Sequence, residues 1–245
     1  SYVTVANKKN FIVSGCNSGY TYSSVFFPIR QGQNLSYNTS NTTSTESYYL
    51  QNKSSSKVTA PDWQKAALRQ WQTSYNAPCD GWLYAECGSG GSQGYITISS
   101  TNITICQQNN GCQSYSSAFV PISSGDQFTF YHQGYPGPCF FIPGLKESEV
   151  GMPNYDQETP QSWNQEYEAP SAGWIYAQCR SYNCSSTSTS YNPGYLMVGG
   201  CPLLISKEYS GYYENASVFI PVAKGTKYIA QGGNSSQSIS FFPGI

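Results

Sequence analysis

The chain has 245 residues, of which only 10 % are charged, and its formal net charge is −1. This balance leaves no electrostatic footprint for nucleic acid, so we expect no nucleic-acid partner. Aromatic residues reach 16 %, which is too many for a disordered polar chain and favours a folded β-rich protein. No apolar run is long enough to cross a membrane, so we expect no membrane insertion.

The first predicted elements are two short alternating strands, at residues 2–5 and 34–38. Between them, Phe26-Phe27-Pro28-Ile29 is followed by Gly32. A short apolar strand, a Pro at its exit and a Gly-containing turn before the next strand are typical of antiparallel β structure. The same pattern recurs downstream in the second half of a longer unit, so residues 1–55 are predicted to be the C-terminal half of an incomplete repeat.

The second predicted unit spans residues 56–147 and begins with a Trp-rich block. A turn or a one-turn helix is predicted from Pro61, with Asp62 as its N-terminal cap. Strands follow at residues 94–98 and 127–131.

The third predicted unit, residues 148–245, repeats the second in the same order. Trp71 and Trp82 recur as Trp163 and Trp174, and the Phe-x-Pro pattern of Phe119 recurs at Phe219. Ordered recurrence of this kind indicates tandem repeats. The fold class is therefore predicted to be all-β, with tandem β-sandwich (jelly-roll-like) domains and very little helix. Half a sandwich leaves an open edge, so we expect upstream sequence or a strand of a neighbouring chain to complete residues 1–55.

The repeat separates two kinds of aromatic residue. The four Trp residues that recur at fixed places are predicted to lie in the core. Tyr and His outside the shared pattern, in loops, are better placed to stack on a sugar ring while neighbouring amides and hydroxyls bond its oxygens. The candidate ligand-binding residues are Tyr131, His132, Tyr135, Tyr182, Tyr191, Tyr209, Tyr212 and Tyr213. For any one of them, ordinary packing of an exposed Tyr remains the alternative.

Catalytic chemistry has little support in the sequence. Asp80 and Glu86 lie beside Trp82, but the third unit has Ala172 and Gln178 at the corresponding places. A glycan-degrading enzyme would need a facing pair of carboxylates. The acidic residues Glu147, Glu149, Asp156 and Glu158 are predicted to form a solvated linker between the units. His132 is the only histidine and no metal-ligand spacing is present, so we predict a protein without enzymatic activity, cofactor or metal.

Nine cysteines without a CxxC pair favour disulfides in an oxidising compartment. Two pairs close in sequence, Cys106–Cys112 and Cys179–Cys184, are the predicted bonds. Eight Asn-x-Ser/Thr sequons are candidates for glycosylation if the protein passes through a glycosylating pathway. They are Asn34, Asn38, Asn41, Asn52, Asn102, Asn183, Asn215 and Asn234.

The order Pro-Asp-Trp, Ala-Pro-x-x-Gly-Trp-Ile/Leu-Tyr-Ala, Phe-x-Pro-Ile/Val-x-x-Gly and Phe-Ile/Phe-Pro-Gly resembles the tandem β-sandwich modules of bacteriophage tail fibres and bacterial surface adhesins. It covers residues 61–244 and the half unit before them. These motifs are structural and carry no binding residue with them. The resemblance implies an extracellular, cell-surface or virion attachment protein that binds a cell-surface polysaccharide or receptor and associates into a fibre. The alternatives are a filament subunit completed by strand exchange and a glycan-degrading enzyme.

Overall fold

The structure, a computed structural model, describes residues 2–5, 9–12, 15–16, 20–23, 26–29, 32–38, 58–90, 93–109, 113–182, 192–208 and 213–245. Within these ranges the chain forms antiparallel sheets almost throughout, which confirms the predicted all-β, sandwich-like fold. The only helical segment described is one 3-10 turn, η1 (Trp63–Lys65). No helix in the described ranges is long and apolar enough to cross a membrane.

Repeat 1 is a sandwich of two sheets built from residues 58–150. Its strands are β6 (Val58–Pro61), β7 (Ala67–Leu68), β8 (Ser74–Asn76), β9 (Gly81–Gly90), β10 (Gln93–Ile98), β11 (Thr101–Asn109), β12 (Gln113–Ile122), β13 (Gln127–His132) and β14 (Tyr135–Val150). One sheet has the order β12-β9-β14, with β6 and β7 both paired to β14, and the other has the order β11-β10-β13-β8. Alternate residues of both sheets, such as Leu83 and Ile96, fill the space between them.

Repeat 2 follows the same plan in residues 159–243. Its strands are β15 (Thr159–Gln161), β16 (Glu166–Glu168), β17 (Gly173–Tyr182), β18 (Gly194–Val198), β19 (Cys201–Glu208), β20 (Tyr213–Val222), β21 (Lys227–Gly232) and β22 (Ser235–Pro243). The sheet orders are β20-β17-β22-β15 and β19-β18-β21-β16. Each pair in repeat 2 therefore has its counterpart in repeat 1.

The two repeats also agree in register. Trp82 of β9 lies opposite Pro121 and Ile142. Trp174 of β17 lies opposite Pro221 and Phe242. Because a shift of one residue would turn every side chain to the other face, an identical register places corresponding side chains in corresponding surroundings.

The N-terminal strands form a third, smaller set. They are β1 (Tyr2–Val5), β2 (Lys9–Ile12), β3 (Gly15–Cys16), β4 (Tyr20–Ser23) and β5 (Leu35–Asn38). The sheet β2-β1-β5 has the pairing of β11-β10-β13, with Val3 opposite Tyr37 where Ile96 lies opposite Phe130. The predicted strands at residues 2–5 and 34–38 are thus confirmed. Independent domains with boundaries near residues 55 and 147 stay a prediction.

Three short ladders connect the three sets in a closed ring. Repeat 1 joins repeat 2 through β12 and β19, where Ser114 lies opposite Glu208. Repeat 2 joins the N-terminal set through β20 and β3, at Glu214 and Cys16. The N-terminal set joins repeat 1 through β4 and β11, where Thr21 lies opposite Gln108. These three residue pairs occupy the same place in the repeat, so the ring uses one contact three times.

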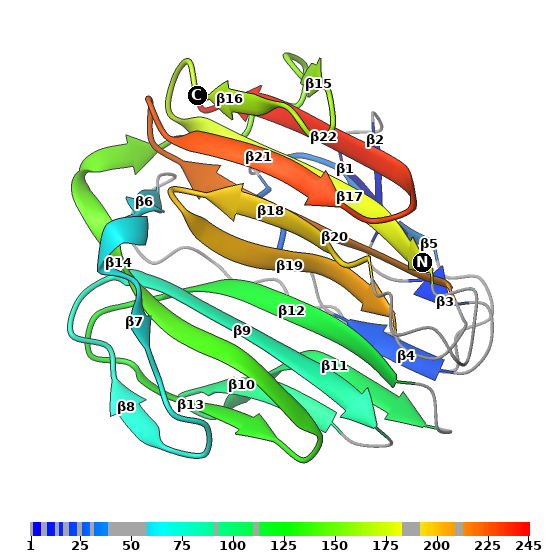
Figure 1. The fold of residues 1–245 in the computed structure, drawn as a ribbon. Coiled ribbons are helices and arrows are strands. Elements are labelled where there is room, and N and C mark those ends of the chain that lie inside the picture. Colours follow the sequence, from blue (N-terminus) through cyan, green and yellow to red (C-terminus); the bar gives the residue numbers. More distant parts are fainter. Residues whose placement is uncertain are drawn as a thin grey trace.

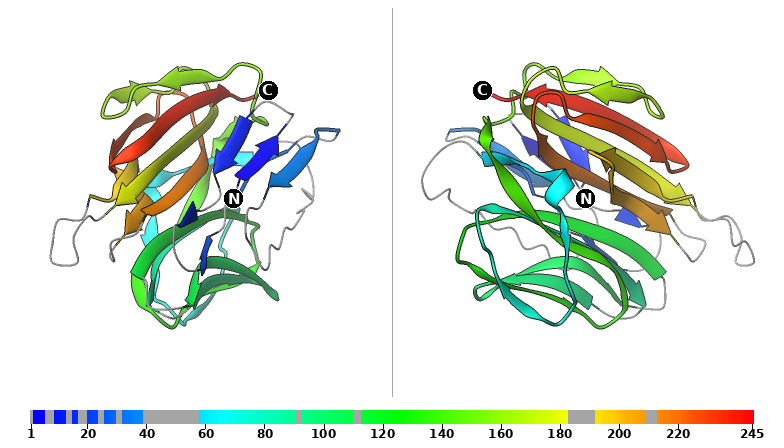
Figure 2. Two further views of the ribbon diagram at one scale, coloured as in Figure 1. Left: turned by 90° about the vertical axis from the view of Figure 1, so that its right-hand side faces the viewer. Right: turned by 60° about the vertical axis from the view of Figure 1, so that its left-hand side comes forward.

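Figures 1 and 2 show how the three sets of strands are arranged. The ladder between β12 and β19 makes one nine-stranded sheet that runs from β16 in repeat 2 to β6 in repeat 1 (Figure 1). In the left view of Figure 2 the N-terminal strands, in blue, lie against both repeats. The ring thereby brings the first strands of the chain next to strands near its end.

An aromatic cluster lies where the repeats meet. Trp82 stacks on Phe119 with ring centres 4.8 Å apart, and Trp174 stacks on Phe219 at 5.4 Å. The two Trp rings meet edge to face at 6.4 Å. Both are fully buried, with 1 % and 0 % of their surface exposed, which confirms their predicted place in the core. Aromatic pairs of this geometry add about 0.5–1.5 kcal/mol each beyond area burial, so they stabilise the junction.

The predicted Pro–Gly turns are present in all three sets. Gly32, Gly125 and Gly225 have φ angles of +82°, +83° and +80°. A side chain is strained in this left-handed region, which explains why glycine occupies each turn. The helix prediction holds only as the single turn η1. Asp62 makes no side-chain capping bond and instead pairs with Lys65 at 2.9 Å.

The predicted Cys106–Cys112 bond is wrong, because Cys106 is bonded to Cys87. Cys87 on β9 and Cys106 on β11 both point into repeat 1, so the disulfide links the two sheets across the sandwich. Closeness in sequence does not show which face of a sheet a side chain takes. Cys112 lies outside the described residues, and so does Cys184, which leaves Cys179–Cys184 a prediction.

The predicted acidic linker is also wrong in part. Glu147 and Glu149 lie within β14, which continues to Val150 and pairs there with β6. Glu158 accepts a hydrogen bond of 2.5 Å from the hydroxyl of Ser240. The edge of β6 provides backbone partners for this segment, so it continues as strand although its composition is acidic.

Candidate functional site

The predicted ligand-binding residues of repeat 1 lie together at one hairpin. Tyr131 and His132 end β13, and Tyr135 begins β14. In repeat 2, Tyr182 and Tyr213 are opposite each other in the ladder of β17 and β20, although only their backbone is described. Tyr191, Tyr209 and Tyr212 lie outside the described residues. The structure therefore describes the side chains of the repeat 1 residues alone.

Tyr131 belongs to a larger neutral surface on the outer side of the sheet β11-β10-β13-β8. Ile96 and Phe130 point into the core, so their strand neighbours point outward by alternation. We call this surface the tyrosine face. It consists of Ser74, Asn76, Tyr95, Thr97, Asn102, Thr104, Gln127, Thr129 and Tyr131.

Two tyrosines form the centre of the tyrosine face. Tyr95 and Tyr131 are directly opposite each other on β10 and β13, and their rings stack with centres 4.6 Å apart. The hydroxyl of Tyr131 accepts a 2.9 Å hydrogen bond from the side-chain amide of Gln133. Two residues further along β10, the hydroxyl of Thr97 donates to the side-chain oxygen of Asn102 on β11 at 2.8 Å. Cross-strand partners hold these side chains in place.

No member of the tyrosine face is charged. Its hydroxyls and amides both donate and accept hydrogen bonds, which matches the groups of a neutral sugar. Asn102 and Thr104 are also the Asn and Thr of a sequon, and Asn102 is exposed. Of the other predicted acceptors, Asn34 and Asn234 are exposed. The side chains of Asn38, Asn41, Asn52, Asn183 and Asn215 lie outside the described ones.

The hairpin of His132 and Tyr135 forms one end of this surface. The His132 ring meets Trp71 edge to face at 5.0 Å, and its Nδ1 donates to the carbonyl of Gly134 at 3.0 Å. Gln72 donates to the His132 carbonyl at 3.1 Å. Tyr135 is half exposed, at 49 %. The hairpin is thus tied to the segment between β7 and β8, and Tyr135 is its most open aromatic side chain.

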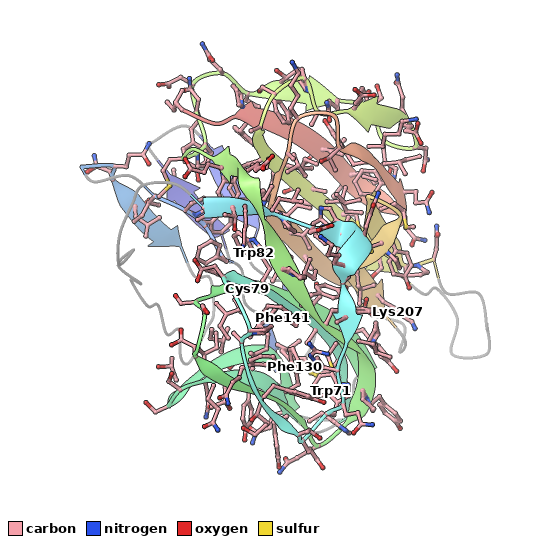
Figure 3. All side chains as sticks on the ribbon, turned by 90° about the vertical axis from the view of Figure 1, so that its left-hand side faces the viewer. Trp71, Cys79, Trp82, Phe130, Phe141 and Lys207 are labelled. Atoms are coloured by element: carbon pink, nitrogen blue, oxygen red, sulfur yellow. A yellow bond between two sulfur atoms is a disulfide. The ribbon has the colours of Figure 1, made fainter. Side chains whose placement is uncertain are left out.

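Trp71 has a structural role here. Its Nε1 donates a 2.8 Å hydrogen bond to the carbonyl of Gly137, and its ring packs edge to face on Phe130 at 5.9 Å. Figure 3 shows Trp71 next to Phe130 within repeat 1, with Trp82 further toward repeat 2. In repeat 2, Trp163 donates a bond of the same length, 2.8 Å, but to the carbonyl of Gly232, which corresponds to His132 rather than to Gly137.

Repeat 2 presents a different surface at the corresponding place. Tyr195 has Gln231 opposite it where Tyr95 has Tyr131. Met197 has Ile229 opposite it where Thr97 has Thr129. At the edge, Lys227 pairs with Glu166 at 3.6 Å. This outer surface therefore mixes apolar and charged side chains with Tyr195 and Gln231, whereas the tyrosine face has no charge.

The most perturbed carboxyl group lies at the junction of the repeats, away from the tyrosine face. Burial raises the pKa of Glu86, although a hydrogen bond from Tyr84 and the charge of Lys207 oppose the shift. The Tyr84 hydroxyl donates to Glu86 at 2.5 Å and accepts from the backbone N–H of Leu204 at 2.7 Å. In repeat 2, Tyr176 donates to the neutral Gln178 at the same distance, 2.5 Å. Since a neutral amide makes the same contact, the contact is structural.

The two carboxylates that lie beside Trp82 in the sequence make separate contacts. Asp80 accepts a 2.7 Å bond from the backbone N–H of Ser124, so it holds a turn while Glu86 faces the junction. The described residues contain no group of three or more Asp, Glu, His or Cys that could hold a metal ion.

A small apolar hollow lies between the repeats. Its lining includes Trp63 and Phe140 from repeat 1 and Cys201 and Leu203 from repeat 2. Burial raises the pKa of the Cys201 thiol, so burial disfavours its nucleophilic thiolate form. The hollow offers packing rather than chemistry.

Comparison with known proteins finds no matching family model and no matching curated sequence. Sequence reasoning missed Tyr95, which recurs as Tyr195 and therefore looked like scaffold. The missing signal was the pairing of the two strands, because only the cross-strand partner distinguishes Tyr95 from its repeat equivalent.

Proposed function

We propose that this protein is a non-enzymatic, extracellular attachment protein that binds a neutral cell-surface glycan through the tyrosine face of repeat 1. The observation that carries the proposal is the stacked pair of Tyr95 and Tyr131 among uncharged hydroxyl and amide side chains. Sugar rings present C–H groups to aromatic faces and hydroxyls to neutral polar groups, and this surface offers both. Tyr135, at the adjoining hairpin, adds a half-exposed aromatic ring.

Two further observations support this reading. The disulfide between Cys87 and Cys106 fits an oxidising, extracellular setting. The tyrosine face lies on a sheet held by the sandwich core, so its side chains are set by strands rather than by loops. If several copies associate into a fibre, weak sites of this kind gain strength by avidity.

The test is a titration of the whole chain against neutral and acidic polysaccharides, followed by saturation-transfer NMR with the best ligand. Tyr95→Ala and Tyr131→Ala should each weaken binding by about 2- to 10-fold, because an aromatic contact contributes about 0.5–1.5 kcal/mol. Gln231→Ala is the matched control, since it changes the corresponding place in repeat 2.

Unchanged binding in the Tyr95→Ala/Tyr131→Ala double variant would exclude this site. Release of product from the glycan panel would instead favour the enzyme alternative, and stronger binding to acidic than to neutral polysaccharides would contradict the role of the uncharged surface.

A further inference from the structure

Besides its two tyrosines, the tyrosine face contains a continuous row of short polar side chains that crosses the sheet. Thr97 on β10 lies opposite Asn102 on β11 and opposite Thr129 on β13. Thr129 in turn lies opposite Ser74 on β8. Directly opposite residues point to the same side of a sheet, so these four side chains form one line, which we call the polar row. The strands that carry it lie side by side in the lower part of Figure 1.

The polar row is long and open at both ends. It spans three spacings between strands, about 14 Å, which is the extent of a short oligosaccharide rather than of a single sugar. Asn102 and Ser74 at its ends are exposed. Ser74 lies on the last strand of the sheet, and β4 pairs with β11 only from Cys106 onward. Within the described ranges no strand closes either end, so a bound chain can continue past both.

The polar row offers hydrogen-bond donors and acceptors along its whole length. The Thr97 hydroxyl donates to the side-chain oxygen of Asn102, which leaves the Asn102 amide group to donate and the Thr97 oxygen to accept. In the described part of the chain, the hydroxyls of Thr129 and Ser74 have no hydrogen-bond partner, so each can donate or accept. Such a row suits a chain of neutral sugars, because every ring of that chain presents hydroxyl groups.

The two tyrosines flank the middle of the polar row. Tyr95 and Tyr131 lie two residues from Thr97 and Thr129 on the same strands, a distance of about 7 Å along each strand. Since the two rings stack on each other, each has one face covered by its neighbour. An aromatic contact is therefore available to a sugar at the centre of the row, whereas sugars at its ends meet only hydroxyl and amide groups.

The sandwich fold does not require this row, because repeat 2 forms the same ladders without it. The corresponding residues of repeat 2 are three apolar side chains and one carboxylate, namely Pro202, Met197, Ile229 and Glu166. The polar row is thus a property of repeat 1, and its four positions differ from repeat 2 together.

We infer that the polar row binds an internal segment of a linear, neutral polysaccharide that lies across the strands, with its central sugar against the two tyrosines. The inference rests on the proposed function and specifies its ligand as an extended chain that is recognised along its length, rather than a chain end or a single sugar. Each position of the row adds to the affinity only when the chain is long enough to reach it. Binding should therefore strengthen with chain length until the chain covers the row.

The test is a calorimetric titration of the full chain with cello-, xylo-, manno- and malto-oligosaccharides, from the disaccharide to the octasaccharide. In a series that binds, we expect the affinity to rise by about tenfold or more over this range, because hydrogen bonds are added at both ends of the row. Oligosaccharides whose reducing end is blocked as a methyl glycoside should bind equally well, because the row recognises internal sugars.

The outcomes separate the inference from the function on which it rests. Affinity that does not depend on chain length, or that is lost when the reducing end is blocked, would overturn the inference while the proposed function stands. Absence of binding to any neutral glycan, from disaccharide to polysaccharide, would contradict the proposed function and the inference with it.

Variants at the two ends of the row test its direction. Ser74→Ala and Asn102→Ala should each weaken octasaccharide binding by about 2- to 10-fold, and should weaken disaccharide binding less. Glu166→Ala is the matched control, because it changes the corresponding edge position of repeat 2 and should leave binding unchanged. Near-ultraviolet circular dichroism checks that the variants are folded. A larger loss from Gln127→Ala than from either end variant would show that the chain runs along the strands, which would overturn the inference.

Discussion

The outer faces of corresponding sheets in the two repeats have the same strand pairing but different side-chain chemistry. In repeat 1, Tyr131 and Thr129 oppose Tyr95 and Thr97, whereas in repeat 2 Gln231 and Ile229 oppose Tyr195 and Met197. The inner and junction residues differ much less, since Trp82 and Trp174 make the same stacks. Packing against the core and the ring fixes one side of each strand, while the other side is free to take up a separate role.

Buried side chains of the two repeats also differ in chemistry at corresponding places, on a smaller scale. Cys106 of repeat 1 corresponds to Ser206 of repeat 2, whose hydroxyl lies 2.6 Å from that of Ser181. Glu86 corresponds to Gln178, and both accept a bond from a Tyr hydroxyl. Each difference offers a way to make one repeat resemble the other and to measure what the difference contributes.

The largest effect is expected from the disulfide that only Cys87 and Cys106 form among the described residues. Replacing both by Ala should lower the free energy of unfolding by about 2–4 kcal/mol, because the bond constrains the unfolded chain and crosses the core. Urea denaturation under oxidising conditions measures this change. Cys79→Ala, which removes a half-buried thiol, should change stability far less. If the free energy of unfolding fell by the same amount in both variants, the Cys87–Cys106 bond would contribute no more to stability than the Cys79 thiol does.

A smaller, pH-dependent effect is expected from Glu86→Gln, which makes the repeat 1 contact like that of Gln178. Burial raises the folded-state pKa of Glu86 above the ordinary 4.5, so its stabilising contribution is complete below that pH and is lost as the pH rises through the raised value. The Gln variant should gain stability relative to the wild type between acidic and neutral pH. Parallel stability curves from pH 4 to pH 8, measured by thermal unfolding, would contradict this.

The smallest effect is expected from Lys227→Gln with Glu166→Gln, which makes that edge of the repeat 2 face neutral. The two side chains are 67 % and 63 % exposed, so their ion pair should contribute less than about 0.5 kcal/mol to the free energy of unfolding. Glycan binding should also stay unchanged, because this face still lacks the second tyrosine. A gain of binding would show that neutrality alone, without the tyrosine pair, makes the site.

Much of the fold was predictable because its signals are local. Pro28, Pro121 and Pro221 with their following glycines mark the strand exits, and alternation marks the strands between them. The disulfide was not predictable from spacing, since Cys87 and Cys106 meet across two sheets. The ring was not predictable either. Its three ladders consist of backbone pairs at residues as different as Ser114, Thr21 and Glu214, and backbone pairing leaves no residue pattern.

The residues of the candidate site were likewise predictable from the sequence only in part. Tyr131, His132 and Tyr135 were proposed because they break the repeat, and Tyr95 was not proposed because it follows the repeat. Comparison of repeats detects a residue that is new to one copy. It does not detect a shared residue whose neighbour has changed, because that property belongs to the pair of strands.

Ring closure also bears on how the chain folds. The ladder of β3 with β20 joins Cys16 to Glu214, nearly the whole length of the chain apart. Contacts of such high sequence separation form slowly, because the intervening chain must be ordered first. During synthesis the edge of β3 has no access to this partner until β20 leaves the ribosome. We therefore expect the ladder of β3 with β20 to form last of the three, whereas the ladder of β4 with β11 can form earlier.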